Sequence, residues 1–199
     1  MYVSLENQVL TKIKKARRGS LFFIDDFVSF GTAKAVNKAL ERLADSGEIT
    51  RVARGIYTRP QFSKILEAPL TPAIEDIAKA IARRDRARIV PTGVYAQHIL
   101  GLSTQIPLKA VYLTDGAART VAIGKRTILF KKTTPKNLAA IGEISGTVIQ
   151  ALKAMENGKI PDEDFKKIVE LLRKEKPARL KHDIRLAPEW IRNILKTAL

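Results

Sequence analysis

Few side chains in this sequence could catalyse a reaction. Cysteine is absent, and there are only two histidines, His98 and His182. A general base needs a partner that positions it, and His98 falls in an apolar segment, which favours packing over catalysis. The adjacent carboxylates Asp25 and Asp26 occur where a helix needs a cap, which favours capping over metal binding. We therefore expect no catalytic residue, no metal site and no cofactor.

The sequence motifs of common enzyme classes are also missing. The chain has no Gly-x-Ser-x-Gly, no phosphate-binding P-loop and no glycine-rich dinucleotide turn. The segment Ser103-Thr104-Gln105 could be mistaken for a nucleophile loop, but the sequence places no base for it. Because no acid–base or metal constellation assembles, the sequence favours a binding protein over an enzyme.

Positive charge is the chemical feature that dominates. The chain has 36 Lys and Arg against 20 Asp and Glu, which gives a formal charge of +16. An excess of this size indicates a polyanionic partner. The net charge is +5 over residues 1–60, +7 over 61–134 and +4 over 135–199. A nucleic-acid surface confined to the N-terminal third would not explain why the middle third is the most basic.

The clearest element that could position these charges is a helix predicted over residues 32–46. Val36, Leu40 and Leu43 recur at i, i+4 and i+7 and form one apolar stripe, so a basic and polar face points the other way. A helix over residues 5–16 and a short helix after Asp25-Asp26 precede it, and two strands around Gly55 follow it.

This order of elements predicts a winged helix-turn-helix in residues 1–60, with the helix 32–46 in the major groove of double-stranded DNA. Asparagine can read adenine, lysine and arginine can contact guanine or phosphate, and a hairpin wing contacts the backbone or the minor groove. The expected DNA-binding residues are Thr32, Lys34, Asn37, Lys38, Arg42, Arg51, Arg54 and Arg59.

The rest of the chain predicts a second domain, which makes the whole protein α+β. Residues 61–70 lack periodicity and read as a linker beside Pro60 and Pro69. Residues 71–199 predict a small antiparallel sheet with helices, followed by a helical C-terminal part. A possible second DNA surface comprises Arg83, Arg84, Arg86, Arg88, Arg119, Lys125 and Arg126, although some of these could instead pair with Asp76, Asp85 or Asp115.

Several segments resemble a known family. They are Leu40-x2-Leu43-x3-Gly47-x-Ile49-x2-Val52-x2-Gly55-Ile56-Tyr57, then Pro91–Ala96, Gly101–Pro107 and the Thr114-Asp115-Gly116 turn. Together they resemble the AbiEi-like type IV antitoxins of abortive-infection toxin–antitoxin systems, over roughly residues 5–133. The resemblance leaves residues 135–199 without a counterpart.

The resemblance implies a transcriptional repressor that binds inverted repeats in its own operator and autoregulates its operon. It also implies a nucleotidyltransferase-like toxin as functional partner, opposed without a tight complex. A basic RNA-binding or ribosome-associated protein is the alternative that the charge leaves open. Only 6% of the residues are aromatic, which disfavours base stacking on single-stranded RNA.

The sequence also bears on location. The N-terminus has no basic and apolar regions of a signal peptide, and no apolar run approaches the length of a membrane helix. With cysteine absent as well, we expect a cytoplasmic protein without a membrane partner.

Overall fold

A computed structural model describes residues 4–63, 67–155 and 160–199. Within these residues the fold is α+β, as the sequence predicts. The chain divides into two compact units, Met1–Ala80 and Ile81–Leu199. The boundary falls inside helix α3 (Ile74–Arg84), whose buried face carries Ile77 and Ala78.

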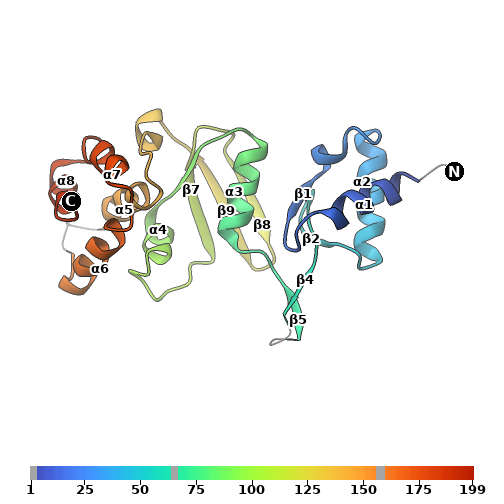
Figure 1. Cartoon of the computed structure of the whole chain (residues 1–199), viewed down its shortest axis with the longest axis horizontal. Coiled ribbons are helices and arrows are strands. Elements are labelled where there is room, and N and C mark those ends of the chain that lie inside the picture. The colour runs from blue at the N-terminus through green and yellow to red at the C-terminus, as the bar shows by residue number, and fades with distance from the viewer. Residues whose placement is uncertain (1–3, 64–66, 156–159) are drawn as a thin grey trace. The chain divides into compact units, whose positions relative to one another are not determined.

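The first unit contains the predicted helices and hairpin (Figure 1). In chain order its first elements are α1 (Leu5–Lys15), β1 (Leu21–Phe23), the 3-10 helix η1 (Ile24–Phe27), α2 (Ala33–Asp45), β2 (Thr50–Ala53) and β3 (Ile56–Thr58). These three strands form an antiparallel sheet in the order β1-β3-β2, and α1 packs against α2.

Local sequence accounts for the limits of α2. The Thr32 hydroxyl accepts a hydrogen bond from the Ala35 backbone N–H at 3.3 Å and so caps the first turn. Gly47 follows the helix with φ +77°, a left-handed conformation that glycine adopts without strain. The apolar stripe is buried: Val36 and Leu40 are fully covered by the core of this unit.

Strands occupy both ends of the segment 61–70, which the sequence predicts to be a linker. Strands β4 (Gln61–Ser63) and β5 (Ala68–Leu70) pair antiparallel, with Phe62 opposite Pro69. Two three-residue strands are too short to show a period of two, so the sequence pattern does not reveal them.

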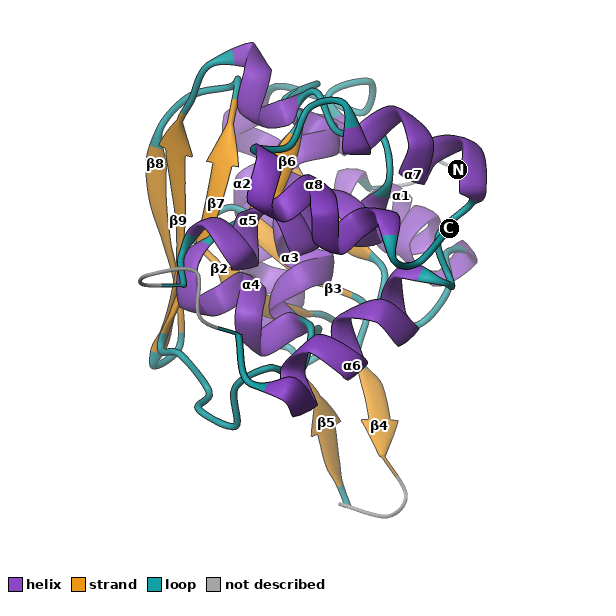
Figure 2. Cartoon of the chain, turned by 90° about the vertical axis from the view of Figure 1, so that its left-hand side faces the viewer, coloured by secondary structure: helices purple, strands orange, loops and turns teal. Residues whose placement is uncertain are grey.

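The second unit is built on a four-stranded sheet in the order β6-β7-β9-β8, which Figure 2 shows side by side. The prediction of an antiparallel sheet is wrong in one pairing, because β7 and β9 run parallel. Turn signals indicate hairpins between neighbouring strands only, and here β9 inserts between β7 and β8. The strands are β6 (Ile89–Pro91), β7 (Lys109–Thr114), β8 (Arg119–Ile123) and β9 (Arg126–Lys132).

The helical C-terminal part is present and has one helix at its centre. Residues Ser145 to Leu152 of α5 (Glu143–Lys153) are all buried, and α4, α6, α7 and α8 contact this helix. A helix covered on all sides needs no polar face, which explains its near-continuous run of small and apolar residues. The other elements are α4 (Gly93–Ile99), the 3-10 helix η2 (Pro135–Leu138), α6 (Asp162–Leu172), α7 (Pro177–Ile184) and α8 (Glu189–Lys196).

Candidate nucleic-acid interface

The exposed face of α2 carries two cations that are not used inside the protein. Lys34 and Lys38 are exposed and lie one turn apart. Among the described residues, neither side chain has an ion-pair or hydrogen-bond partner. Their positive charge is therefore available to a ligand of the helix, because the buried stripe holds α2 against α1 and η1 from the other side.

Three other predicted contacts on this helix have partners within the unit. The Asn37 amide donates to Glu41 Oε1 at 2.9 Å, and Arg42 Nη1 lies 3.8 Å from Glu6 Oε2. Both pairs are on the surface, where such contacts contribute little and can be exchanged for a ligand. The Thr32 hydroxyl caps the helix, so its role in the unit is structural.

The β2–β3 hairpin presents two further cations. Arg51 and Arg54 are exposed, and neither has an ion pair or a side-chain hydrogen bond within the described residues. Arg54 lies in the turn beside Gly55, which has φ +70° and permits the tight reversal. Arg51 lies opposite Tyr57, where burial raises the pKa of the Tyr57 hydroxyl and the arginine charge partly opposes that rise.

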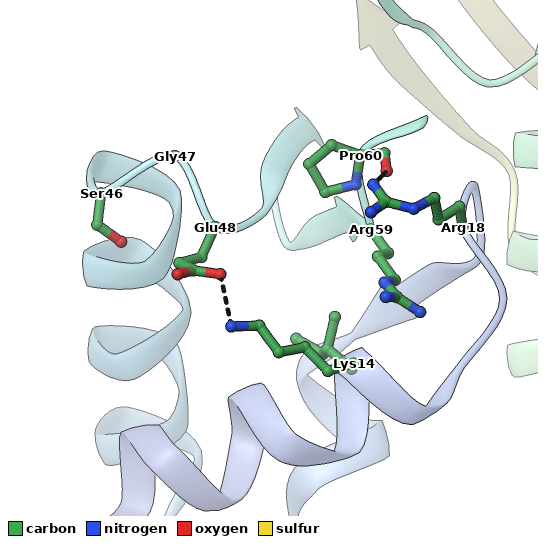
Figure 3. Close-up of a pocket in the computed structure, with 8 residues that line it drawn as sticks. Lys14, Arg18, Ser46, Gly47, Glu48, Arg59 and Pro60 are labelled. Carbon is green, nitrogen blue, oxygen red and sulfur yellow. Dashed lines mark hydrogen bonds and ion pairs between the residues drawn. The ribbon is translucent and has the colours of Figure 1, made fainter. Parts of the chain in front are cut away.

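Arg59, the last predicted wing residue, is held within the unit instead. Its guanidinium donates to the Ala16 carbonyl at the end of α1. Next to it, Arg18 Nη1 donates to the Pro60 carbonyl at 3.2 Å and Lys14 Nζ lies 3.0 Å from Glu48 Oε2, around a cleft of about 370 Å³ (Figure 3). Of these three cations, Arg59 bonds a carbonyl at the C-terminal end of α1, where unpaired carbonyls favour positive charge.

The predicted second surface is partly neutralised by carboxylates. Arg88 donates its backbone N–H and its Nε to Asp115, at 2.7 and 2.8 Å, and these bonds lower the pKa of the Asp115 carboxyl. Arg84 and Arg119 share Asp85, and burial, followed by repulsion from Arg84, lowers the pKa of Arg119.

Most of the other cations of the predicted second surface remain available to bind a ligand. Arg83, Arg86 and Lys125 are exposed and have no side-chain partner among the described residues. Arg126 is half-buried, and its Nε is buried without a partner in the described part of the chain. The sequence identifies these cations as one group. Pairing over long sequence distances divides them into cations held by carboxylates and cations without a carboxylate partner.

Two buried polar residues, Ser145 and Asp183, lie beside the half-exposed His182. Ser145 Oγ donates to Asp183 Oδ2 at 2.5 Å, and His182 Nδ1 lies 2.8 Å from Asp183 Oδ1. A catalytic triad places the histidine between the nucleophile and the acid, whereas here the carboxylate stands between the other two. Asp183 also accepts the backbone N–H groups of Ile141 and Gly142, both at 2.9 Å, so it anchors the segment that leads into α5.

The described residues hold no group of three or more His, Asp or Glu side chains arranged for a metal ion. In the same residues, no helix is both long enough and apolar enough to cross a bilayer.

Comparisons with known proteins assign a family to the chain. The chain is similar to the RV2827C protein from Mycobacterium tuberculosis, whose crystal structure aligns with all of this chain and 83% of that one, at 12% identity and a TM-score of 0.48. No curated protein matches the chain. Residues 8–180, most of the sequence, match the family of unknown function DUF6088, and the protein is therefore a member of DUF6088.

Proposed function

We propose that the protein is a sequence-specific, double-stranded DNA-binding repressor, and that its first unit is a winged helix-turn-helix. The observation that carries the proposal is the set of four exposed cations without partners among the described residues, Lys34 and Lys38 on α2 and Arg51 and Arg54 on the β2–β3 hairpin. In a winged helix these elements are the recognition helix and the wing, and η1 takes the place of the short second helix.

Charge and geometry support DNA as the partner of this surface. An α-helix fits the major groove, where lysine contacts guanine or phosphate, and a hairpin arginine fits the backbone or the minor groove. Asn37 can read adenine once its amide leaves the exposed Glu41. Arg59 and Thr32 then act inside the unit, orienting the wing and the helix, and do not contact DNA directly.

The biological role that we propose rests on the resemblance to AbiEi-like type IV antitoxins. The protein would repress its own operon by binding inverted repeats in the operator, and would oppose a nucleotidyltransferase-like toxin without forming a tight complex with it.

Autoregulation is the direct test of this role. Deleting the gene while leaving its promoter intact should raise transcription from that promoter, measured with a reporter. Supplying the wild-type protein from another locus should restore repression, whereas the Lys34→Ala/Lys38→Ala variant should not. A promoter that is indifferent to the deletion would contradict the repressor and favour a role in binding RNA.

Two of the predicted wing residues, Arg54 and Arg59, should give opposite results when each is replaced by alanine. Arg54→Ala should reduce the slope of log affinity against log salt by about 0.9, the value for one phosphate contact, and leave the unfolding midpoint unchanged. Arg59→Ala should lower the unfolding midpoint, because the Ala16 carbonyl loses its donor, and leave the salt slope unchanged. Salt titrations of operator binding and thermal unfolding measure both quantities, and the reverse pattern would mean that Arg59 is the wing contact.

A further inference from the structure

Residues 173–185 carry charges of both signs in the sequence, but the folded protein buries the acidic ones. The segment contains six basic and two acidic residues. Both acidic side chains are buried: Glu175 is 8% exposed and Asp183 is not exposed. Glu175 Oε2 accepts the Ile144 backbone N–H at 2.9 Å, and Asp183 accepts those of Ile141 and Gly142. The acidic charges are therefore turned inward onto the start of α5.

The six basic residues are all exposed and have no side-chain partner among the described residues. Lys181 on α7 and Arg185 at its C-cap are one turn apart, about 100° around the helix from the buried Leu180 and Ile184. In Figure 1 this helix lies in the α6–α8 group, at the end of the second unit that carries the C-terminus. Arg179 and Lys181 lie on α7, Lys176 and Arg185 cap its two ends, and Arg173 and Lys174 follow α6. We name these six exposed residues together the α7 basic face: Arg173, Lys174, Lys176, Arg179, Lys181 and Arg185.

We propose that the α7 basic face binds duplex DNA through its phosphates, independently of base sequence. The choice of DNA rests on the proposed function of the first unit. The face itself predicts a phosphate backbone, because the segment 173–185 exposes cations and no carboxylate, and exposed cations gain affinity by releasing counterions from a polyanion. Arg83, Arg86 and Lys125 form a smaller set, because carboxylates hold their neighbours Arg84, Arg88 and Arg119.

Other polyanionic or acidic partners fit the face less well. The segment 173–185 has no Phe, Tyr or Trp on which the bases of a single strand could stack. Its two large apolar side chains, Leu180 and Ile184, are buried, so it has no apolar face to insert into a membrane. The same lack of apolar anchors disfavours an acidic protein surface.

The test is a salt titration of the full chain on its operator and on a scrambled duplex of equal length. The Arg179→Gln/Lys181→Gln/Arg185→Gln variant should reduce the salt slope by about 2.7 on both duplexes, at about 0.9 for each phosphate that is no longer neutralised. Its affinity deficit against wild type should therefore shrink by about 40-fold between 50 and 200 mM salt. The preference for the operator should not change. The single variant Lys181→Gln should reduce the slope by about 0.9, and it tests the same surface if the triple variant folds poorly.

The matched control removes three exposed lysines from the sheet of the same unit, as Lys109→Gln/Lys131→Gln/Lys132→Gln. Its salt slope should equal that of wild type. A wild-type slope in the α7 variants, or an equal reduction in the control, would overturn the proposal. The proposal would also be overturned if the α7 variants bound DNA as wild type does but no longer bound phosphatidylserine vesicles. If Lys34→Ala/Lys38→Ala leaves operator preference intact, the first unit's proposed function fails, whereas the α7 variants report on this face alone.

Discussion

The Lys34→Ala/Lys38→Ala variant should bind the operator more weakly than wild type. Each lost contact between a lysine and a base should cost about 1–3 kcal/mol, which is about 5- to 150-fold in affinity. It should also discriminate less between the operator and a scrambled duplex. Both lysines are exposed on a helix fixed from its other side, so their removal affects ligand binding and leaves the core of the unit untouched.

The matched control is Lys15→Ala/Arg17→Ala, which removes the same charge from the C-terminal end of α1. These two side chains are also exposed and without partners among the described residues. The control should lose little affinity and no sequence discrimination, measured by fluorescence anisotropy at one salt concentration. If the α2 variant keeps wild-type affinity and preference while remaining folded, α2 is not the element that reads DNA. If both variants lose affinity equally, α2 acts only through its charge.

Replacing the buried carboxylate of Asp183 should have the largest effect on stability. The Asp183→Ala variant should lower the free energy of unfolding of the second unit by about 3–5 kcal/mol, as for other broken buried charge networks. The backbone N–H groups of Ile141 and Gly142 and the hydroxyl of Ser145 would all lose their acceptor inside the protein. Because Asp183 is completely buried, bulk water does not reach its position to serve as the acceptor instead.

The single tryptophan of the chain makes this measurement specific. Trp190 is on α8, so its fluorescence during urea unfolding reports on the second unit. The control is His182→Ala, which removes only a half-exposed neighbour of the same carboxylate and should cost less than about 1 kcal/mol. An unfolding midpoint of Asp183→Ala equal to that of wild type would show that this carboxylate does not hold α5 in place.

Local sequence determined most of the first unit. The apolar stripe of Val36, Leu40 and Leu43 repeats at the helical period, and Thr32 and Gly47 mark the two ends of the helix. Gly55 marks the turn of the hairpin in the same way. Period, capping and turn chemistry act between residues a few positions apart, so they can be recognised before the chain is folded.

Only the tertiary structure decided which charges are free. Arg88 meets Asp115 across 27 positions, and the donor of Arg59 meets the Ala16 carbonyl across 43. The parallel pairing of β7 with β9 has the same origin, because it joins strands that are not neighbours along the chain. The burial of Glu175 and Asp183 converts a mixed segment into a basic surface. Composition counts every charge equally, whereas burial and long-range pairing remove particular charges from the surface, and both depend on the topology that brings distant residues together.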